Sequence, residues 1–80
     1  MKMFATELQN KTVMSAEGKI LGTLDNLVVD TNTGKIHHML LFPAEDIDPS
    51  AYRVDTQGRI VLPFTKVKSA KDVVVLGPLD

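Results

Sequence analysis

The fold is decided by residues 18–30, which read GKILGTLDNLVVD. This stretch is rich in β-forming residues and is long enough for one extended strand. Its apolar side chains fall into two phases of the strand alternation, Ile20 and Leu24 in the first and Leu27 and Val29 in the second. Because successive side chains of a strand point to opposite faces, the phase must change near Asp25 if all four are to reach one core. Such a change indicates a β-bulge or a sharp coil, which the corners of a β-barrel require.

The predicted turns share one pattern, in which a glycine is followed by a basic residue and an isoleucine. The pattern occurs at residues 18–20, 34–36 and 58–60, each time after a short polar segment. A glycine in this position suits a type I turn that is followed by a residue with positive φ. The sequence therefore predicts three β-hairpins, and their unequal spacing argues against a repeat array.

The whole pattern predicts an all-β fold, a small β-barrel of about six strands with short helical turns. The predicted strands are Thr12–Met14, Ile20–Asp30, Ile36–Phe42, Tyr52–Val54, Ile60–Leu62 and Val73–Leu76.

Three segments are predicted to lie outside the strands. Residues 65–70 fit one helical turn capped by Thr65. Residues 3–8 fit either a helical turn or the lead-in to a strand. Residues 43–51 contain two prolines and three acidic residues, which indicates an exposed and mobile acidic loop.

The apolar strand positions exceed what one barrel interior needs. The predicted core consists of Ile20, Leu24, Leu27, Val29, Ile36, Leu40, Leu62, Val67, Val73 and Val75. A sheet with one solvated face alternates apolar and polar residues, whereas residues 39–42 and 73–76 are apolar on both faces. The outward side chains of these runs are therefore predicted to form a subunit interface, and they are Met39, Leu41, Val74 and Leu76. Either a homodimer or a mixed dimer with a paralogue would bury them.

Length and composition are those of one small globular domain that covers residues 1–80. The chain contains no cysteine, which excludes disulfides and thiolate metal sites. A formal net charge of −1 gives no general attraction to nucleic acid or anionic lipid. No apolar run approaches the ~20 residues of a membrane span. We therefore expect a cytoplasmic protein that does not bind nucleic acid and that reaches a membrane only through a partner.

The residues that could carry chemistry do not form a catalytic or metal-binding pattern. His37 and His38 are neighbours on a predicted strand, so their rings should point to opposite faces and should not converge on one metal. Residues 30–34 resemble the opening of a calcium loop, but the positions that need a ligand, a glycine and a glutamate hold glycine, lysine and leucine. The acidic loop offers no apolar pocket of the kind that acid–base catalysis uses, although it contains Glu45, Asp46 and Asp48. The sequence predicts no enzyme activity, no metal and no cofactor.

Several stretches follow one another along nearly the whole chain in the order of a known family. They are Phe4–Leu8 leading into Lys11–Val13, then Gly18–Leu27, Asp30–Ile36, and Ile60–Val67 running into Asp72–Gly77. In this order they resemble the PRC-barrel domain, and the chain is most similar to free-standing archaeal members of that family. The resemblance implies a compact β-barrel that docks on other proteins without catalysis.

The resemblance also implies two settings for such docking. Some free-standing archaeal members work in cell division and bridge to SepF, the membrane-anchored adaptor of the FtsZ ring. This implies an adaptor with a SepF-like partner at the division site. The alternative is a docking module of ribosome assembly or RNA processing, which resembles the C-terminal domain of RimM.

Overall fold

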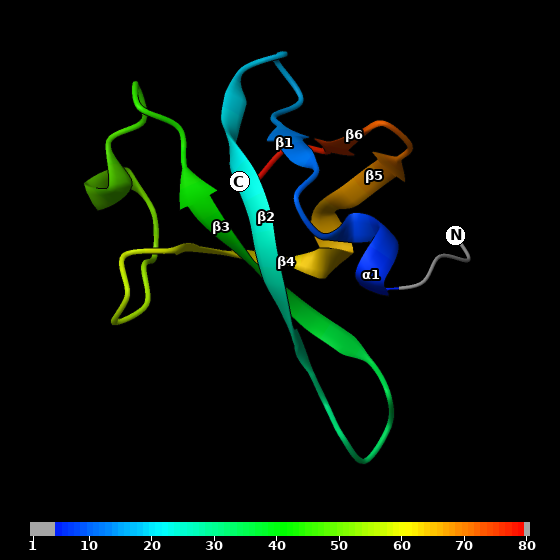
Figure 1. Cartoon of the computed structure of the whole chain (residues 1–80). Helices are drawn as coiled ribbons and strands as arrows, with labels where there is room; N and C mark the ends of the chain where they lie inside the picture. The colour runs from blue at the N-terminus through cyan, green and yellow to red at the C-terminus, as the bar shows by residue number, and fades with distance from the viewer. Residues whose placement is uncertain (1–4, 80) are drawn as a thin grey trace.

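The computed structural model describes residues 5–79 and confirms a mostly β fold with six strands in one sheet (Figure 1). The elements are α1 (Ala5–Leu8), β1 (Thr12–Met14), β2 (Ile20–Val29), β3 (Ile36–Pro43), the 3₁₀ helix η1 (Pro49–Ala51), β4 (Ile60–Pro63), the 3₁₀ helix η2 (Phe64–Lys66), β5 (Val67–Ala70) and β6 (Val73–Leu76). The strand order is β4-β3-β2-β1-β6-β5, and all neighbours are antiparallel except β1 and β6. The edge strands β4 and β5 are joined through η2 and are not paired with each other in the described part of the chain, so the barrel is not closed.

The three predicted turns are present, and each contains a glycine at positive φ, namely Gly18 at 86°, Gly34 at 76° and Gly58 at 79°. In each turn the glycine N–H donates to the carbonyl of the residue that opens the turn, which is Ser15, Asp30 or Asp55. In the third turn, Asp55 Oδ1 also accepts hydrogen bonds from the N–H groups of Gln57 and Arg59. A side chain at these glycines would be strained, which explains why the glycine pattern identified the turns correctly.

Acidification should destabilise the protein through aspartates that cap its turns. Hydrogen bonds lower the pKa of three of them, chiefly those from the Arg59 N–H to Asp55, from the Asn32 N–H to Asp30 and from the Ser50 hydroxyl to Asp48. A carboxyl with a lowered pKa in the folded state stabilises the fold above its unfolded pKa of about 3.9. That contribution is lost as the pH falls through the folded pKa. We therefore expect the urea midpoint of unfolding to be constant from about pH 7 to pH 5 and to fall below about pH 4.

The variant Asp55→Asn isolates one of these carboxyls. It should unfold at a lower urea concentration than the parent at neutral pH, and it should lose less of its remaining stability on acidification. Asp46→Asn removes a charge from an exposed position of the acidic loop and is the matched control, which should follow the parent curve. If Asp55→Asn lost as much stability on acidification as the parent, the Asp55 carboxyl would be excluded as a cause of the acid destabilisation.

The predicted phase change in β2 is confirmed as a β-bulge. The register with β3 shifts between Leu24 and Asn26, so Asp25 is the extra residue. The shift lets two leucines of opposite alternation face the same core, where Leu24 is buried and Leu27 packs against the buried cluster. The bulge therefore has the function predicted for it at a barrel corner.

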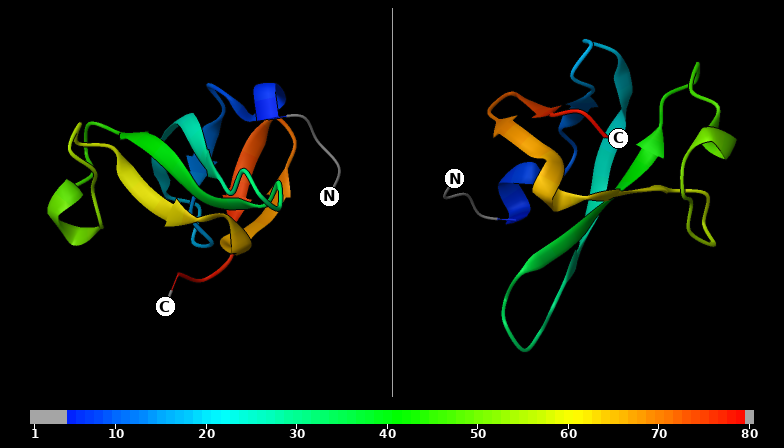
Figure 2. Two further views of the ribbon diagram at one scale, coloured as in Figure 1. Left: turned by 90° about the horizontal axis from the view of Figure 1, so that it is seen from below. Right: turned by 180° about the vertical axis from the view of Figure 1, so that it is seen from behind.

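Two residues of β2 that were predicted to be core are exposed. Ile20 is 49% exposed and Val29 is 43% exposed. A second register shift, between β1 and β2, turns Leu21 inward in place of Ile20. Val29 lies in the outer part of the β2–β3 hairpin, which extends beyond the rest of the barrel (Figures 1 and 2). Of the other predicted core residues, Leu24, Leu40 and Leu62 are buried, and Leu27, Ile36, Val67, Val73 and Val75 are half-buried.

Two predictions about the C-terminal half are wrong. Tyr52–Val54 is not a strand, because only Val54 forms a bridge, with Ile60. Residues 65–70 do not form one helical turn, because η2 ends at Lys66 and β5 follows it. β5 pairs with β6, and this tertiary pairing overrides the local preference that suggested a helix.

The N-terminal segment contains a helical turn, which was one of its two predicted forms. Residues 3 and 4 of that segment lie outside the described residues. Leu8 at the end of α1 is 2% exposed, and the N–H of Asn10 donates to the carbonyl of Leu24 at 2.8 Å. α1 is therefore held against β2. None of the helices in residues 5–79 has the length and apolar character needed to cross a membrane.

The acidic loop is exposed as predicted, but it has a buried anchor. Its three acidic side chains are exposed, namely Glu45, Asp46 and Asp48. Ile47 is only 6% exposed and belongs to the core, and the N–H of Ala44 donates to the carbonyl of Leu21. The loop lies on the opposite side of the barrel from α1 (Figure 2). Its mobility stays a prediction.

Candidate protein-interaction surface

The structure places the predicted interface residues in the core of a single chain. Each of the four is 0% exposed, and they are Met39, Leu41, Val74 and Leu76. A partner cannot contact them while the fold is intact, so the interface predicted from these side chains is wrong. The outward side chains of the two apolar runs are instead Phe42, Val73 and Val75, together with Leu40, which is only 9% exposed.

The error is one of phase. Residues 39–42 and 73–76 are apolar at every position, so their alternation does not distinguish the inner face from the outer face. The register of the sheet does distinguish them, because Leu41 lies between Leu24 and Ile60 in one row of buried side chains.

An apolar patch lies on the outer face of the sheet where β3, β2, β1 and β6 are neighbours. One row across these strands contains Phe42, Thr23, Thr12 and Val73, and the next contains Ile20, Met14 and Val75. Phe42 is 54% exposed and Ile20 is 49% exposed, and the other apolar members are half-buried. Together these five apolar side chains form the outer-face patch, which consists of Met14, Ile20, Phe42, Val73 and Val75.

The outer-face patch has the properties of a docking surface. Its side chains stand on hydrogen-bonded strands and are therefore held in fixed positions before any partner arrives. A large exposed aromatic side chain such as Phe42 is the kind of residue that anchors protein interfaces. Isolated exposed apolar residues are ordinary, whereas a contiguous group of them marks an interaction site.

A charged cluster lies on the same outer face, beyond Phe42. Arg59 Nη1 is 2.7 Å from Asp25 Oδ2, and Arg59 Nε is 2.8 Å from Asp55 Oδ2. Since β3 lies between β2 and β4, the side chain of Arg59, which directly precedes β4, must cross β3 to reach the bulge in β2. The bond to Asp25, and then that to Asp55, raises the pKa of Arg59, so the guanidinium stays charged. The cluster fixes the bulge and turn that border the patch.

The sequence contained only indirect signs of this cluster. Asp25 was identified as the place of the phase change, and Arg59 as the basic residue of a turn. Their contact spans 34 residues of the chain, and neither alternation nor turn chemistry predicts a pairing over that separation.

The two histidines lie near the outer end of the β2–β3 hairpin. Their ring centroids are 6.4 Å apart and the ring planes are tilted by 38°. His37 is the extra residue at a second irregularity in the β2–β3 register. His37 Nε2 is 3.6 Å from Asp30 Oδ2, and both groups are partly exposed. Within residues 5–79, no three His, Asp or Glu side chains are grouped closely enough to hold a metal ion.

Comparison with known proteins places this fold in a family. A model of the PRC-barrel domain matches residues 1–79. Among solved structures, a similar chain is a RimM protein of Pseudomonas aeruginosa that is assigned to 16S ribosomal RNA processing, with 18% sequence identity and a TM-score of 0.66. The similarity covers 95% of this chain and 43% of that protein, so this chain spans less than half of its length. No curated protein matches. The family match over nearly the whole chain, together with the six-stranded sheet, shows that the chain belongs to the PRC-barrel domain family.

Proposed function

We propose that this chain is a non-catalytic docking module that binds another protein through the outer-face patch. The observation that carries the proposal is the exposure of Phe42 and Ile20 on strands whose inner faces already form a filled core. The core does not need these two side chains, and their burial against a partner would be favourable by about 25 cal/mol per Å² of apolar surface. The same surface gives no support for chemistry, because its members carry no titratable or nucleophilic group.

The proposed setting is archaeal cell division, with a SepF-like protein as the partner. Support for this setting comes from the resemblance of the sequence to free-standing archaeal PRC-barrel proteins. The family match over residues 1–79 supports only the PRC-barrel fold that this setting requires. In this setting the chain links its partner to the machinery of the FtsZ ring. Any association with the membrane is indirect and depends on the partner.

A docking role in ribosome assembly or RNA processing is the second candidate. The observation that favours it is the likeness of the fold to a protein assigned to 16S ribosomal RNA processing. At 18% identity this likeness concerns the fold alone. The second candidate function therefore requires that both proteins bind their partners through a similar face of the sheet. In this case too the partner is proposed to be a protein, since the net charge of −1 offers no general attraction to RNA.

Site-specific photo-crosslinking distinguishes the two settings. Phe42 is replaced by a photoreactive phenylalanine analogue in the cells that produce the protein, and the cross-linked partner is identified by mass spectrometry. Because Phe42 is 54% exposed, the analogue should leave the fold intact. We expect a cross-link to a SepF-like division protein.

The matched control places the same analogue at Val54, which is 43% exposed but lies outside the outer-face patch. This position should give no cross-link to the same protein. A ribosomal protein cross-linked at Phe42 would replace the first setting by the second. The same products from both positions, or none from Phe42, would contradict docking through the outer-face patch.

A further inference from the structure

The outer half of β2 has a free edge. β2 pairs with β3 along its length, but it pairs with β1 only between Ile20 and Thr23. In the part of the chain that the structure describes, no strand pairs with the other side of Asn26–Val29. This segment belongs to the hairpin that extends beyond the barrel, so its edge is accessible (Figures 1 and 2).

Side chains take the place of a neighbouring strand at this edge. The N–H of Leu27 donates to Oδ1 of Asn26 at 2.8 Å, and the carbonyl of Asp25 accepts from Nε2 of Gln9 at 3.2 Å. Both bonds are exposed. The Asn26 amide is therefore a local cap that can rotate away and leave the Leu27 N–H free for a strand partner.

The edge lacks the features by which proteins protect exposed strands. Edge strands are usually blocked by charges, by proline or by a covering element. Residues 26–29 contain neither a charge nor a proline, and two β-branched side chains are exposed there, Val28 by 42% and Val29 by 43%. An uncharged segment of this composition favours pairing with another strand.

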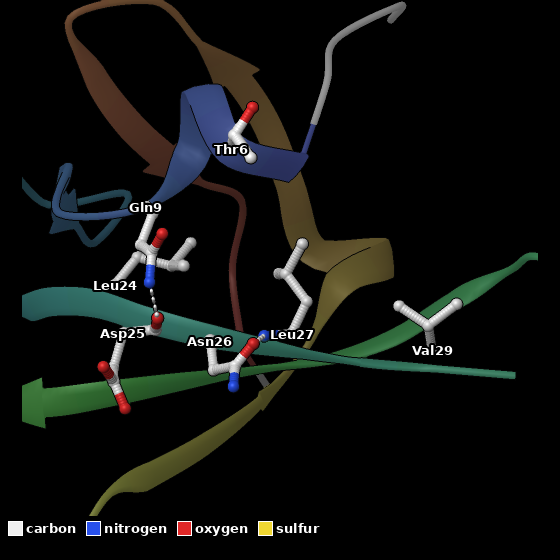
Figure 3. Close-up of a pocket in the computed structure, with 7 residues that line it drawn as sticks. All are labelled: Thr6, Gln9, Leu24, Asp25, Asn26, Leu27 and Val29. Atoms are coloured by element: carbon white, nitrogen blue, oxygen red, sulfur yellow. Dashed lines mark hydrogen bonds between the residues drawn. The ribbon is translucent and has the colours of Figure 1, made fainter.

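A shallow apolar cavity lies beside the same edge (Figure 3). It has a volume of about 210 Å³, and Leu27 and Val29 both point to the side of β2 on which α1 lies. The rest of its lining consists of Leu24, Thr6, Gln9, Asp25 and Asn26. Side chains of an added strand would therefore find apolar surface on this face of β2 as well as backbone groups at its edge.

We propose that the free edge of β2 pairs antiparallel with β2 of a second copy of this chain, about a two-fold axis at Val28. Val28 then faces the partner's Val28, and Leu27 faces the partner's Val29. Along this segment of the sequence, the charged residue nearest to Val28 is Asp30, which lies opposite the partner's Asn26. The strand is thus complementary to itself, because apolar side chains meet apolar ones and no like charges are opposed.

This self-pairing replaces the dimer predicted from the buried side chains and uses a different part of β2 from the outer-face patch. The patch uses β2 at Ile20, and the pairing uses Asn26–Val29. Failure of the pairing would therefore leave the proposed docking function untouched, and the converse also holds.

A charge-complementation experiment at Val28 tests the pairing. The parent protein should have twice the chain mass of 8.8 kDa in light scattering at about 10 µM. Val28→Lys and Val28→Glu should each weaken the dimer by roughly 100-fold, because each brings two like charges together at the axis. Val28 is 42% exposed, so both variants should remain folded by circular dichroism. An equimolar mixture of the two variants should restore a dimer that contains one copy of each in native mass spectrometry.

The matched control is Val54→Lys, which adds the same charge at a position of similar exposure and should stay dimeric. A monomeric parent protein, or a Val28→Lys variant that is still dimeric, would overturn the proposal. The proposal would also be overturned if the mixture of Val28→Lys and Val28→Glu formed no dimer containing one copy of each variant.

Discussion

Replacing Gly22 with alanine is expected to lower the free energy of unfolding by about 3 kcal/mol or more. Gly22 is buried in β2 opposite Pro43, where the backbone of β3 leaves no room for a Cβ atom. A methyl group on Gly22 would overlap the carbonyl oxygen of Phe42, which is fixed in the backbone of β3. Since no flexible side chain can move away, either β2 or β3 must shift. An 80-residue domain has a total stability on the order of 5–10 kcal/mol, so a large fraction of it would be lost.

Gly77→Ala is the matched control for this substitution. A methyl group there would lie 3.7 Å from the carbonyl oxygen of Lys66, which is an ordinary contact distance. This variant should change the urea midpoint little. Equal midpoints for Gly22→Ala and Gly77→Ala would contradict the close approach of β2 and β3.

Truncating Leu41 to alanine is expected to cost about 2–5 kcal/mol, whereas truncating its neighbour Phe42 should cost less than about 1 kcal/mol. Leu41 is 0% exposed and lies in the central buried row of the sheet, so its truncation leaves a cavity. Phe42 is 54% exposed on the outer face, so the larger side chain contributes less to the fold. Urea unfolding of the two variants measures the difference.

This pair tests the assignment of the two faces directly. If β3 had the opposite phase, Phe42→Ala would be the more damaging substitution and Leu41→Ala the milder one. A ranking of that kind would also remove Phe42 from the outer-face patch.

The turns and the bulge were predictable because local chemistry fixes them. Gly18, Gly34 and Gly58 occupy backbone conformations that other residues adopt only with strain, and they mark their turns in the sequence. The bulge at Asp25 was visible because the apolar phase changes there. In both cases the signal and its cause lie within a few residues of each other.

The faces of the two apolar runs were not predictable in the same way. The alternation of apolar and polar residues shows which face of a strand is buried only where the other face is polar. Residues 39–42 and 73–76 are apolar at every position. Their phase depends on pairing with strands that are distant in sequence. The predicted excess of apolar positions over one core is nevertheless confirmed, and the structure places that excess on Phe42 and the other members of the outer-face patch.

β5 was missed because its own sequence does not favour a strand. Residues 67–70 contain Lys68 and Ser69, and the segment follows a short helical turn. It becomes a strand because β6, which is strongly β-forming, supplies a neighbour for it. The pairing of Arg59 with Asp25 was missed for a similar reason, since it depends on how the strands are ordered in space.

We propose that a complete single-chain core presents the outer-face patch to a protein partner. Cross-linking first identifies the partner, which is then purified. The most direct test titrates this partner into three proteins, namely the parent, Phe42→Asp and Val54→Asp. We predict that Phe42→Asp remains folded but binds roughly 30-fold more weakly or worse, as expected for loss of a central anchor. Val54→Asp, with similar exposure outside the patch, should bind like the parent. Equal affinities for the parent and a folded Phe42→Asp protein would contradict the account.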